Sequence, residues 1–320
     1  MARWGRRLAK IVAGLALLLL AGLWLGWTPD TDPAAMRAKY GGAPSQFVDL
    51  GGGLRVHLRD EGPRAAPVIV LLHGSNADLH TWDAWGAQLA GKYRVIRYDQ
   101  IGHGLTGPNP RGTYATSDFA DTLEALVQKL SLDTFVLAGN SMGGGIAVRY
   151  ALDHPARLRG LVLIDAAGAP KTEASPGNIG FALARTPGMG WLMQRVTPRG
   201  VIARSLHQTV VNQAVVTPAV IDRYWELLRY PGNRAATAAR FGQGYSRYTA
   251  RQVVAIKVPT LILWGADDPL LPVDGGRWYQ AAIPGSALIV YPATGHLPME
   301  EVAARSASDL AAWLEKQPPR

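Results

Sequence analysis

The sequence predicts an α/β fold, with a mostly parallel, doubly wound sheet and helices on both faces. Apolar runs of strand length end in Gly or close to Asp, as in "PVIVLLHG" (67–74) and "LRGLVLIDA" (158–166), and such runs suit strands buried on both faces. Stretches with helical spacing follow them, such as "TSDFADTLEALVQKL" (116–130). The chain has 320 residues, of which 48% are hydrophobic and 18% charged, so it can bury one large core.

Strands and helices alternate along most of the chain, which predicts parallel βαβ units. The first element differs, because "QFVDLGGGLRVHLRDEG" (46–62) alternates polar and apolar residues around three glycines and predicts a β-hairpin. Further strands are expected over 93–99, 133–139, 259–265 and 286–292, and further helices over 142–155, 274–283 and 300–316.

Residues 171–257 interrupt this alternation. They contain helical patterns such as "PAVIDRYWELLRY" (218–230) but no convincing strand. The simplest interpretation is a helical cap inserted between two strands of a core formed by residues 45–170 and 258–320.

The N-terminus predicts a membrane anchor. A basic tail, residues 1–10, precedes an uncharged apolar run, residues 11–29, and 19 helical residues span roughly 28 Å, about one bilayer core. We therefore expect a transmembrane helix over 11–28 and a linker over 29–44. The alternative is a cleaved secretory signal, whose apolar part usually runs about 7–15 residues. Both place the tail in the cytoplasm and the rest of the chain on the periplasmic or extracytoplasmic side.

Charge and composition narrow the function classes. The absence of cysteine excludes a disulfide, a thiolate metal site and a Cys nucleophile. The formal net charge is +9, and residues 171–257 carry 12 Lys/Arg against 3 Asp/Glu. These cations form either a solvated surface or a patch that attracts anionic lipid head groups or an anionic substrate. No basic–aromatic module predicts a nucleic-acid partner, and no ligand spacing predicts a metal or another cofactor.

The stretch "VLAGNSMGGGIAV" (136–148) carries the chemistry. It contains G-x-S-x-G, from Gly139 through Ser141 to Gly143, between a predicted strand and a predicted helix. Glycines permit a tight turn that holds the Ser hydroxyl above the sheet edge. The helix N-terminus then supplies N–H groups where an oxyanion would form. The alternative interpretation is an ordinary Gly-rich turn.

A nucleophilic Ser needs a base, and the base needs an orienting acid. "LILWGADDP" places Asp267 and Asp268 just after a strand, and "YPATGHLPME" places His296 after the last strand. The chain order Ser, Asp, His is the order expected for this architecture.

At this point the chain resembles the α/β-hydrolase superfamily, over roughly residues 45–320. Five motifs occur in the family's order: "HGSN" after the third strand, "DQIGHG" after the fourth, "GNSMGG" at the turn, "WGADDPLLP" after the seventh and "GHLPMEE" at the end. The resemblance implies the α/β-hydrolase fold and a Ser-His-Asp triad.

The resemblance also implies roles for individual residues. Ser141 is expected to be the nucleophile, His296 the general base and Asp268 the orienting acid, because the family pattern W-G-x-x-D ends on Asp268. Asp165 is an alternative acid, since some members place it after the sixth strand, and Asp267 is another.

The remaining candidate site residues surround the nucleophile. The backbone N–H groups of Ser75 and Met142 are expected to form the oxyanion hole. Met189, Trp191 and Phe181 could line an apolar substrate channel under the cap; the alternative is that they pack the cap on the core.

We expect a serine hydrolase that cleaves a carboxylic ester, hydrophobic or lipid-like, through an acyl-enzyme. The alternative is a carbon–carbon bond hydrolase of vinylogous diketones, which "GNSMGG" resembles. Members of that group usually carry a Gly-Pro-Gly loop after the HG and Trp after the catalytic His, where this chain has "SNADLHTW" and Leu297-Pro298. The alternative of another class is a membrane-tethered binding protein with an inactive hydrolase fold.

Overall fold

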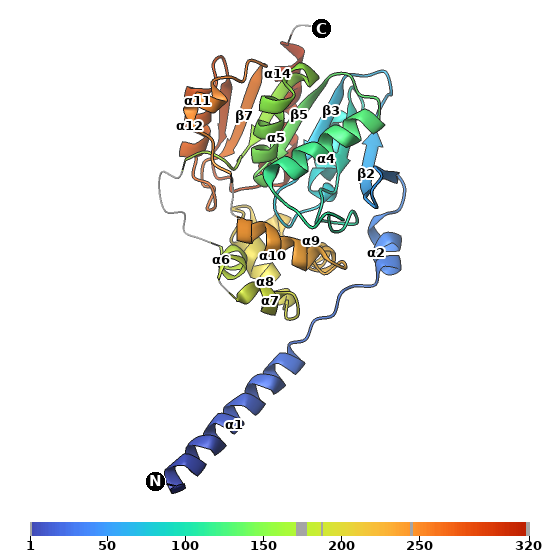
Figure 1. The fold of residues 1–320 in the computed structure, drawn as a ribbon. Coiled ribbons are helices and arrows are strands. Elements are labelled where there is room, and N and C mark those ends of the chain that lie inside the picture. Colours follow the sequence, from blue (N-terminus) through green and yellow to red (C-terminus); the bar gives the residue numbers. More distant parts are fainter. Residues whose placement is uncertain (1, 171–177, 187, 244–245, 318–320) are drawn as a thin grey trace.

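An eight-stranded sheet organises the chain, in a computed structural model that describes residues 2–170, 178–186, 188–243 and 246–317 (Figure 1). The strand order is β1-β2-β4-β3-β5-β6-β7-β8. The pairs β1–β2 and β2–β4 are antiparallel and the other pairs are parallel, so the predicted mostly parallel sheet is confirmed. The strands are β1 (Ser45–Asp49), β2 (Arg55–Glu61), β3 (Val68–Leu72), β4 (Arg94–Tyr98), β5 (Phe135–Asn140), β6 (Leu158–Ile164), β7 (Thr260–Gly265) and β8 (Ala287–Tyr291).

Helices cover both faces of the sheet, so two apolar cores form. One core includes side chains of α4, α5 and α12, and the other includes side chains of α3 and α14. The predicted C-terminal helix over 300–316 is divided in two at Val302. The bounds are α3 (Asp83–Leu89), α4 (Thr116–Lys129), α5 (Met142–Asp153), α12 (Asp274–Ala282), α13 (Pro298–Glu301) and α14 (Ala303–Glu315), with short 3₁₀ turns at Leu79–Trp82, Pro155–Arg157 and Gln213–Val215.

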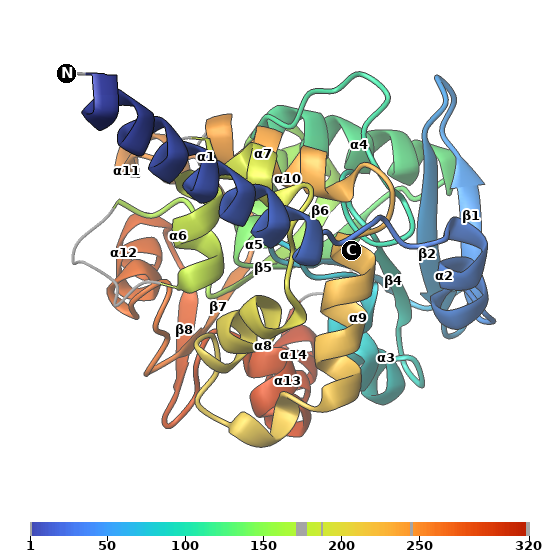
Figure 2. The same ribbon diagram turned by 90° about the horizontal axis from the view of Figure 1, so that it is seen from below.

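The segment between β6 and β7 is helical in its described residues. Its first five helices, which we call the cap helices, lie over one end of the sheet, on the side from which α1 projects (Figures 1 and 2). The helix that follows them, α11 (Ala250–Val253), instead packs against α5 and α12 of the core. The cap helices are α6 (Ile179–Arg185), α7 (Met189–Met193), α8 (Arg199–His207), α9 (Pro218–Leu228) and α10 (Asn233–Gln243).

The N-terminal segment differs from the expected anchor. A helix does form, α1 (Ala2–Leu25), and it projects from the rest of the molecule (Figure 1). However, no helix in the described part of the chain has both the length and the apolar character to cross a membrane. The transmembrane helix predicted over 11–28 is therefore not supported.

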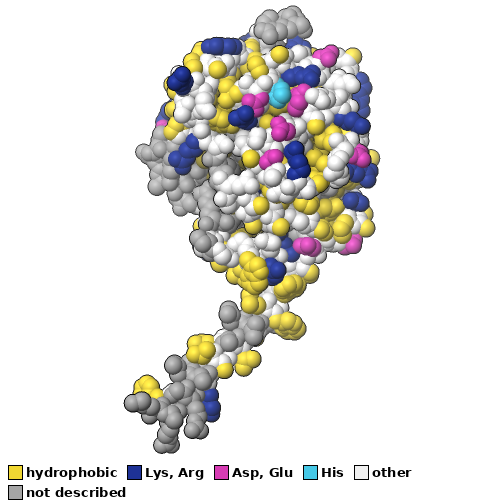
Figure 3. Space-filling model, viewed as in Figure 1, with side chains coloured by type: hydrophobic (Ala, Val, Ile, Leu, Met, Phe, Trp, Pro, Cys, Tyr) yellow, Lys and Arg dark blue, Asp and Glu magenta, His cyan; other side chains and the backbone are white. Residues whose placement is uncertain are grey.

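The segment expected to be a linker is partly helical. Asp32 caps α2 (Pro33–Tyr40), because its carboxylate accepts a hydrogen bond from the Ala35 N–H (2.7 Å). Lys39 and Tyr40 at the end of α2 both donate hydrogen bonds to Glu226 on α9. Hydrophobic side chains gather on the surface where α1 joins the cap helices (Figure 3).

Candidate active site

The turn between β5 and α5 has room only for glycine at positions 139 and 143, two residues before and two residues after Ser141. A Cβ at Gly139 would lie 2.3 Å from the Gly143 carbonyl oxygen, and a Cβ at Gly143 would lie 2.3 Å from the Leu72 carbonyl oxygen. Real Cβ atoms do not approach backbone this closely, because the repulsion is too steep. The spacing G-x-S-x-G is thus dictated by close packing of α5 against β5 and β3.

Ser141 has a strained backbone that its neighbours hold in place. Its φ is 54° and its ψ is −118°, a conformation that is unfavourable for a residue with a Cβ. The Ser141 N–H donates to the Ile164 carbonyl (3.0 Å), while the Ser141 carbonyl accepts from the N–H groups of Gly145 (3.1 Å) and Ala167 (2.9 Å). These three bonds keep Ser141 at the sheet edge.

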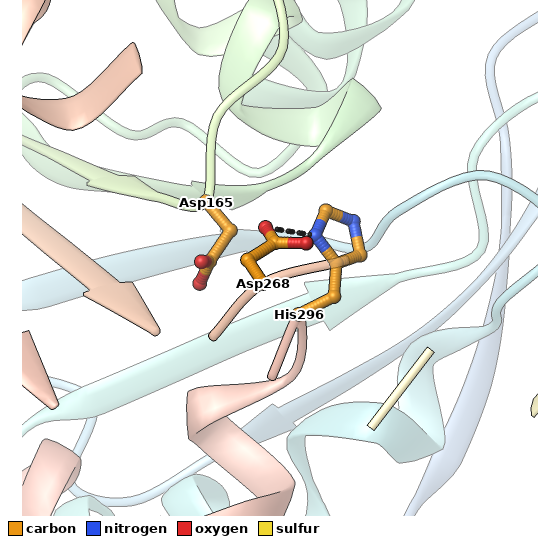
Figure 4. Close-up of side chains that lie close together, drawn as sticks. All are labelled: Asp165, Asp268 and His296. Carbon is orange, nitrogen blue, oxygen red and sulfur yellow. Dashed lines mark hydrogen bonds and ion pairs between the residues drawn. The ribbon is translucent and has the colours of Figure 1, made fainter. Parts of the chain in front are cut away.

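His296 and Asp268 form a buried pair at the same edge (Figure 4). Nδ1 of His296 lies 2.6 Å from Oδ2 of Asp268. The other carboxylate oxygen accepts hydrogen bonds from the N–H groups of Leu270 (2.7 Å) and Leu271 (3.0 Å). A carboxylate held in this way fixes the Nδ1–H tautomer, so Nε2 keeps a lone pair for taking a proton.

Two polar residues that sequence reasoning missed support the loop of His296. Nδ2 of Asn140, one residue before the nucleophile, donates to the His296 carbonyl (3.1 Å). The buried carboxylate of Glu301 accepts from the N–H groups of Gly295 (3.0 Å) and Leu297 (3.2 Å). Both residues lie inside motifs, in "GNSMGG" and "GHLPMEE", which was a signal that could have identified them.

Asp165 lies beside this pair, but the carboxylate that is hydrogen-bonded to His296 is that of Asp268 (Figure 4). It follows β6 with a positive φ of 43°. Its Oδ1 accepts from the Gly265 N–H (2.9 Å), and its Oδ2 has no hydrogen-bond partner. Complete burial, and next the nearby charge of Asp268, raise the pKa of Asp165 well above its ordinary value. The other alternative acid, Asp267, is exposed.

The same three side chains are the group in the described chain that could most readily offer metal ligands. One ligand atom from each of Asp165, Asp268 and His296 lies within 4.8 Å of the others. In this arrangement, however, Asp268 and His296 are hydrogen-bonded directly to each other. A metal would have to displace that bond, so the geometry favours an imidazole oriented by Asp268 over a metal site.

Ser141 and His296 face one cavity of about 220 Å³ that lies between the core and the cap helices. Ser75, the predicted oxyanion donor, lines it too. Most of the remaining wall is apolar and comes from the cap. Its side chains include Met189, Leu192, Met193, Val196, Ile202 and Leu206.

Of the other predicted site residues, Met142 and Met189 lie at the site and Trp191 does not. Met142 begins α5 directly after the nucleophile, so its N–H lies at the helix N-terminus. Met189 lines the cavity. Trp191 does not line it: the side chain is 58% exposed and stacks on the Arg195 guanidinium, 4.6 Å from the ring centroid. The side chain of Phe181 lies outside the part that the structure describes.

The loop that carries Ser75 is held in position by the hydrogen bonds of a neutral histidine, His73. Nε2 of His73 accepts the Gln100 N–H (3.0 Å), so Nδ1 carries the proton and donates to the Gly74 carbonyl (2.8 Å). Burial lowers the pKa of His73, which keeps the imidazole uncharged. His73 therefore positions the loop.

These features place Ser141, Asp268 and His296 at one edge of a mostly parallel sheet, and comparison with known proteins shows which family has this fold. The model of the α/β-hydrolase fold family matches residues 67–302. The chain belongs to this family.

Characterised and uncharacterised relatives cover most of the chain. A 2-hydroxymuconate semialdehyde hydrolase of Pseudomonas sp. (strain CF600) is 30% identical over 288 residues, which are 85% of this chain and 96% of the relative. An uncharacterised protein of Mycobacterium tuberculosis is 28% identical over 273 residues, covering 80% of this chain and 77% of the relative. The crystal structure of a membrane phospholipase A superposes with a TM-score of 0.75 at 26% identity, covering 96% of this chain and 98% of that one.

Proposed function

We propose that this protein hydrolyses carboxylic esters with an apolar acyl group through a Ser141–His296–Asp268 triad. The observation that carries the proposal is that the buried His296–Asp268 pair and the strained Ser141 open into one apolar cavity. A lone Ser hydroxyl is a weak nucleophile, and this arrangement supplies the base and the acid that activate it.

The geometry supports a two-step reaction. Oγ of Ser141 attacks the ester carbonyl, and Nε2 of His296 takes the hydroxyl proton. The oxyanion accepts hydrogen bonds from the N–H groups of Ser75 and Met142. The tetrahedral intermediate collapses, His296 returns the proton to the leaving alkoxide, and an acyl-Ser141 ester remains. A water then repeats the sequence, which releases the carboxylic acid and free Ser141.

The substrate class follows from the cavity wall. Apolar side chains from α7 and α8 surround the space next to Ser141, and an acyl chain buried there gains about 0.8 kcal/mol per methylene. The membrane phospholipase A among the structural neighbours cleaves, by its name, an ester of a lipid. This likeness supports a hydrophobic or lipid-like ester.

Carbon–carbon bond hydrolysis is the second candidate, because the 2-hydroxymuconate semialdehyde hydrolase is 30% identical. Its substrate type, a dienoate, would bring a carboxylate into the site. The wall of the cavity next to Ser141 is mostly apolar, and its arginine, Arg234, donates hydrogen bonds to the Asp30 carboxylate (2.6 Å) and the Thr28 carbonyl (2.7 Å). Ester hydrolysis therefore accounts better for the cavity.

The test is labelling of the full chain with a fluorophosphonate, read by intact mass. We expect one adduct, lost in Ser141→Ala and in His296→Ala and retained in the control Ser117→Ala, whose side chain is exposed on α4. p-Nitrophenyl esters of two to twelve carbons and a vinylogous diketone then follow. Faster cleavage of longer esters supports the proposal; cleavage of the diketone alone favours the second candidate. No adduct on folded protein refutes both.

A further inference from the structure

One cap helix reaches the oxyanion loop directly. α10 carries Arg240 and Thr237 one turn apart, so their side chains lie on the same face of the helix. Nη1 of Arg240 donates to Oγ of Ser75 (2.8 Å), and Nη2 lies 3.3 Å from Oδ1 of Asn76. Oγ1 of Thr237 donates to the same Asn76 oxygen (3.2 Å). Three hydrogen bonds thus connect the cap with two consecutive loop residues.

The loop is also confined on its other side. A Cβ at Gly74 would lie 2.9 Å from Oδ1 of Asn140 and 3.2 Å from Cβ of Ser141, so the loop backbone already touches the nucleophile's turn. Asn76 has a positive φ of 60°, a conformation that costs energy outside glycine and persists where neighbours hold it. The loop therefore lies between the Ser141 turn and α10.

We propose that Arg240 is a positioning residue for the oxyanion hole: through Ser75 and Asn76 the cap holds the loop so that the Ser75 N–H points at the developing oxyanion. This inference rests on the proposed function. Arg240 is not part of the wall of the substrate cavity, so it acts through Ser75. The cap then both encloses the acyl chain and assembles the catalytic donors.

Position and charge both contribute to this role. The Arg240 side chain is buried, with 4% exposure, so water screens its guanidinium poorly. A cation bonded to the Ser75 side chain adds positive potential close to where negative charge develops. Arg→Lys would keep the charge but lose the two-point contact of the planar guanidinium, which allows the two contributions to be separated.

The experiment compares Arg240→Met and Arg240→Lys with the full-length wild type on the best ester substrate. The matched control is Arg229→Met: this cap arginine is also buried but donates to the Pro29 carbonyl (2.9 Å), away from the loop. Removing one oxyanion donor costs about 10²–10³-fold in kcat; loosening it should cost less. We expect Arg240→Met to lower kcat about 10–100-fold with KM nearly unchanged, and Arg240→Lys to lower it less.

The second measurement is the affinity of a trifluoromethyl ketone inhibitor, which would not change in step with kcat/KM if Arg240 had a purely structural role. It forms a tetrahedral oxyanion on Ser141, so its affinity should fall by the same factor as kcat/KM in each variant. Thr237→Val, which removes one bond to Asn76, should lower both quantities by a smaller, equal factor, and it tests the inference should Arg240→Met not fold.

Three results would overturn the inference. They are a kcat within twofold of wild type in folded Arg240→Met, an effect confined to KM, and a fall in kcat that inhibitor affinity does not follow. Absence of ester hydrolysis and of fluorophosphonate labelling in the wild type would instead refute the proposed function, so the two failures are distinguishable.

Discussion

Asp165→Asn should stabilise the protein increasingly as the pH rises. The folded state raises the pKa of Asp165 well above its ordinary value of 3.8 through burial and through Asp268. Folding above pH 3.8 must therefore bind a proton, and stability falls by about 1.4 kcal/mol per pH unit until the folded pKa is reached. Asn is neutral in both states and its Oδ1 can still accept the Gly265 N–H that Asp165 binds at 2.9 Å.

The assay is urea unfolding of both proteins at pH 5, 6 and 7. The free energy of unfolding of Asp165→Asn minus that of the wild type should increase with pH, by about 1.4 kcal/mol per pH unit while the pH stays below the folded-state pKa. Asp267→Asn, at an exposed carboxyl, is the control and should show no such slope. A difference that does not change with pH would mean that Asp165 is ionised in the folded protein, and the reasoning would be refuted.

Three further predictions concern the turn, the triad and the core. Gly139→Ala places a Cβ 2.3 Å from the Gly143 carbonyl oxygen and should lower the free energy of unfolding by about 3 kcal/mol, measured in urea. Asp268→Asn should lower kcat about 10⁴-fold, because the amide favours the wrong tautomer of the imidazole. The melting temperature should change little. A kcat near that of the wild type would contradict the triad. Trp85→Phe removes the bond from Nε1 to Oγ of Ser306 (3.0 Å) and should cost about 1–3 kcal/mol in unfolding free energy, with activity retained at 25 °C.

The parts of the site that the sequence predicted are those fixed by local geometry. A strand, a tight turn and a helix must follow each other within a few residues, so "GNSMGG" predicts where Ser141 lies on the sheet. The carboxyl ends of parallel strands share one edge; consequently, the residues after β7 and β8 were expected near Ser141. The structure brings Asp268 and His296 together there.

The cap was predictable as helical but not in its contacts. Twelve basic residues over 171–257 were interpreted as a solvated surface or as a patch for anions. The structure instead uses several of them internally: Arg223 binds the buried Asp78 carboxylate (3.2 Å), and Arg240 binds Ser75. The first pair holds the pKa of Asp78 below its ordinary value despite the opposing effect of burial. Charge counts could not separate paired from free cations, since the partners lie more than a hundred residues away in the chain.

The contacts between the N-terminal segment and the cap could not be predicted from composition either. Composition suggested that residues 29–44 merely connect an anchor to the core, yet residues within this segment and Thr28 just before it bind the cap. Arg234 on α10 donates to the Thr28 carbonyl (2.7 Å) and to Asp30 (2.6 Å). The same helix presents Arg240 to the oxyanion loop. One cap helix therefore joins the N-terminal segment to the loop of Ser75, and a chain shortened past Asp30 would leave the Arg234 guanidinium without its carboxylate next to the cavity at Ser141.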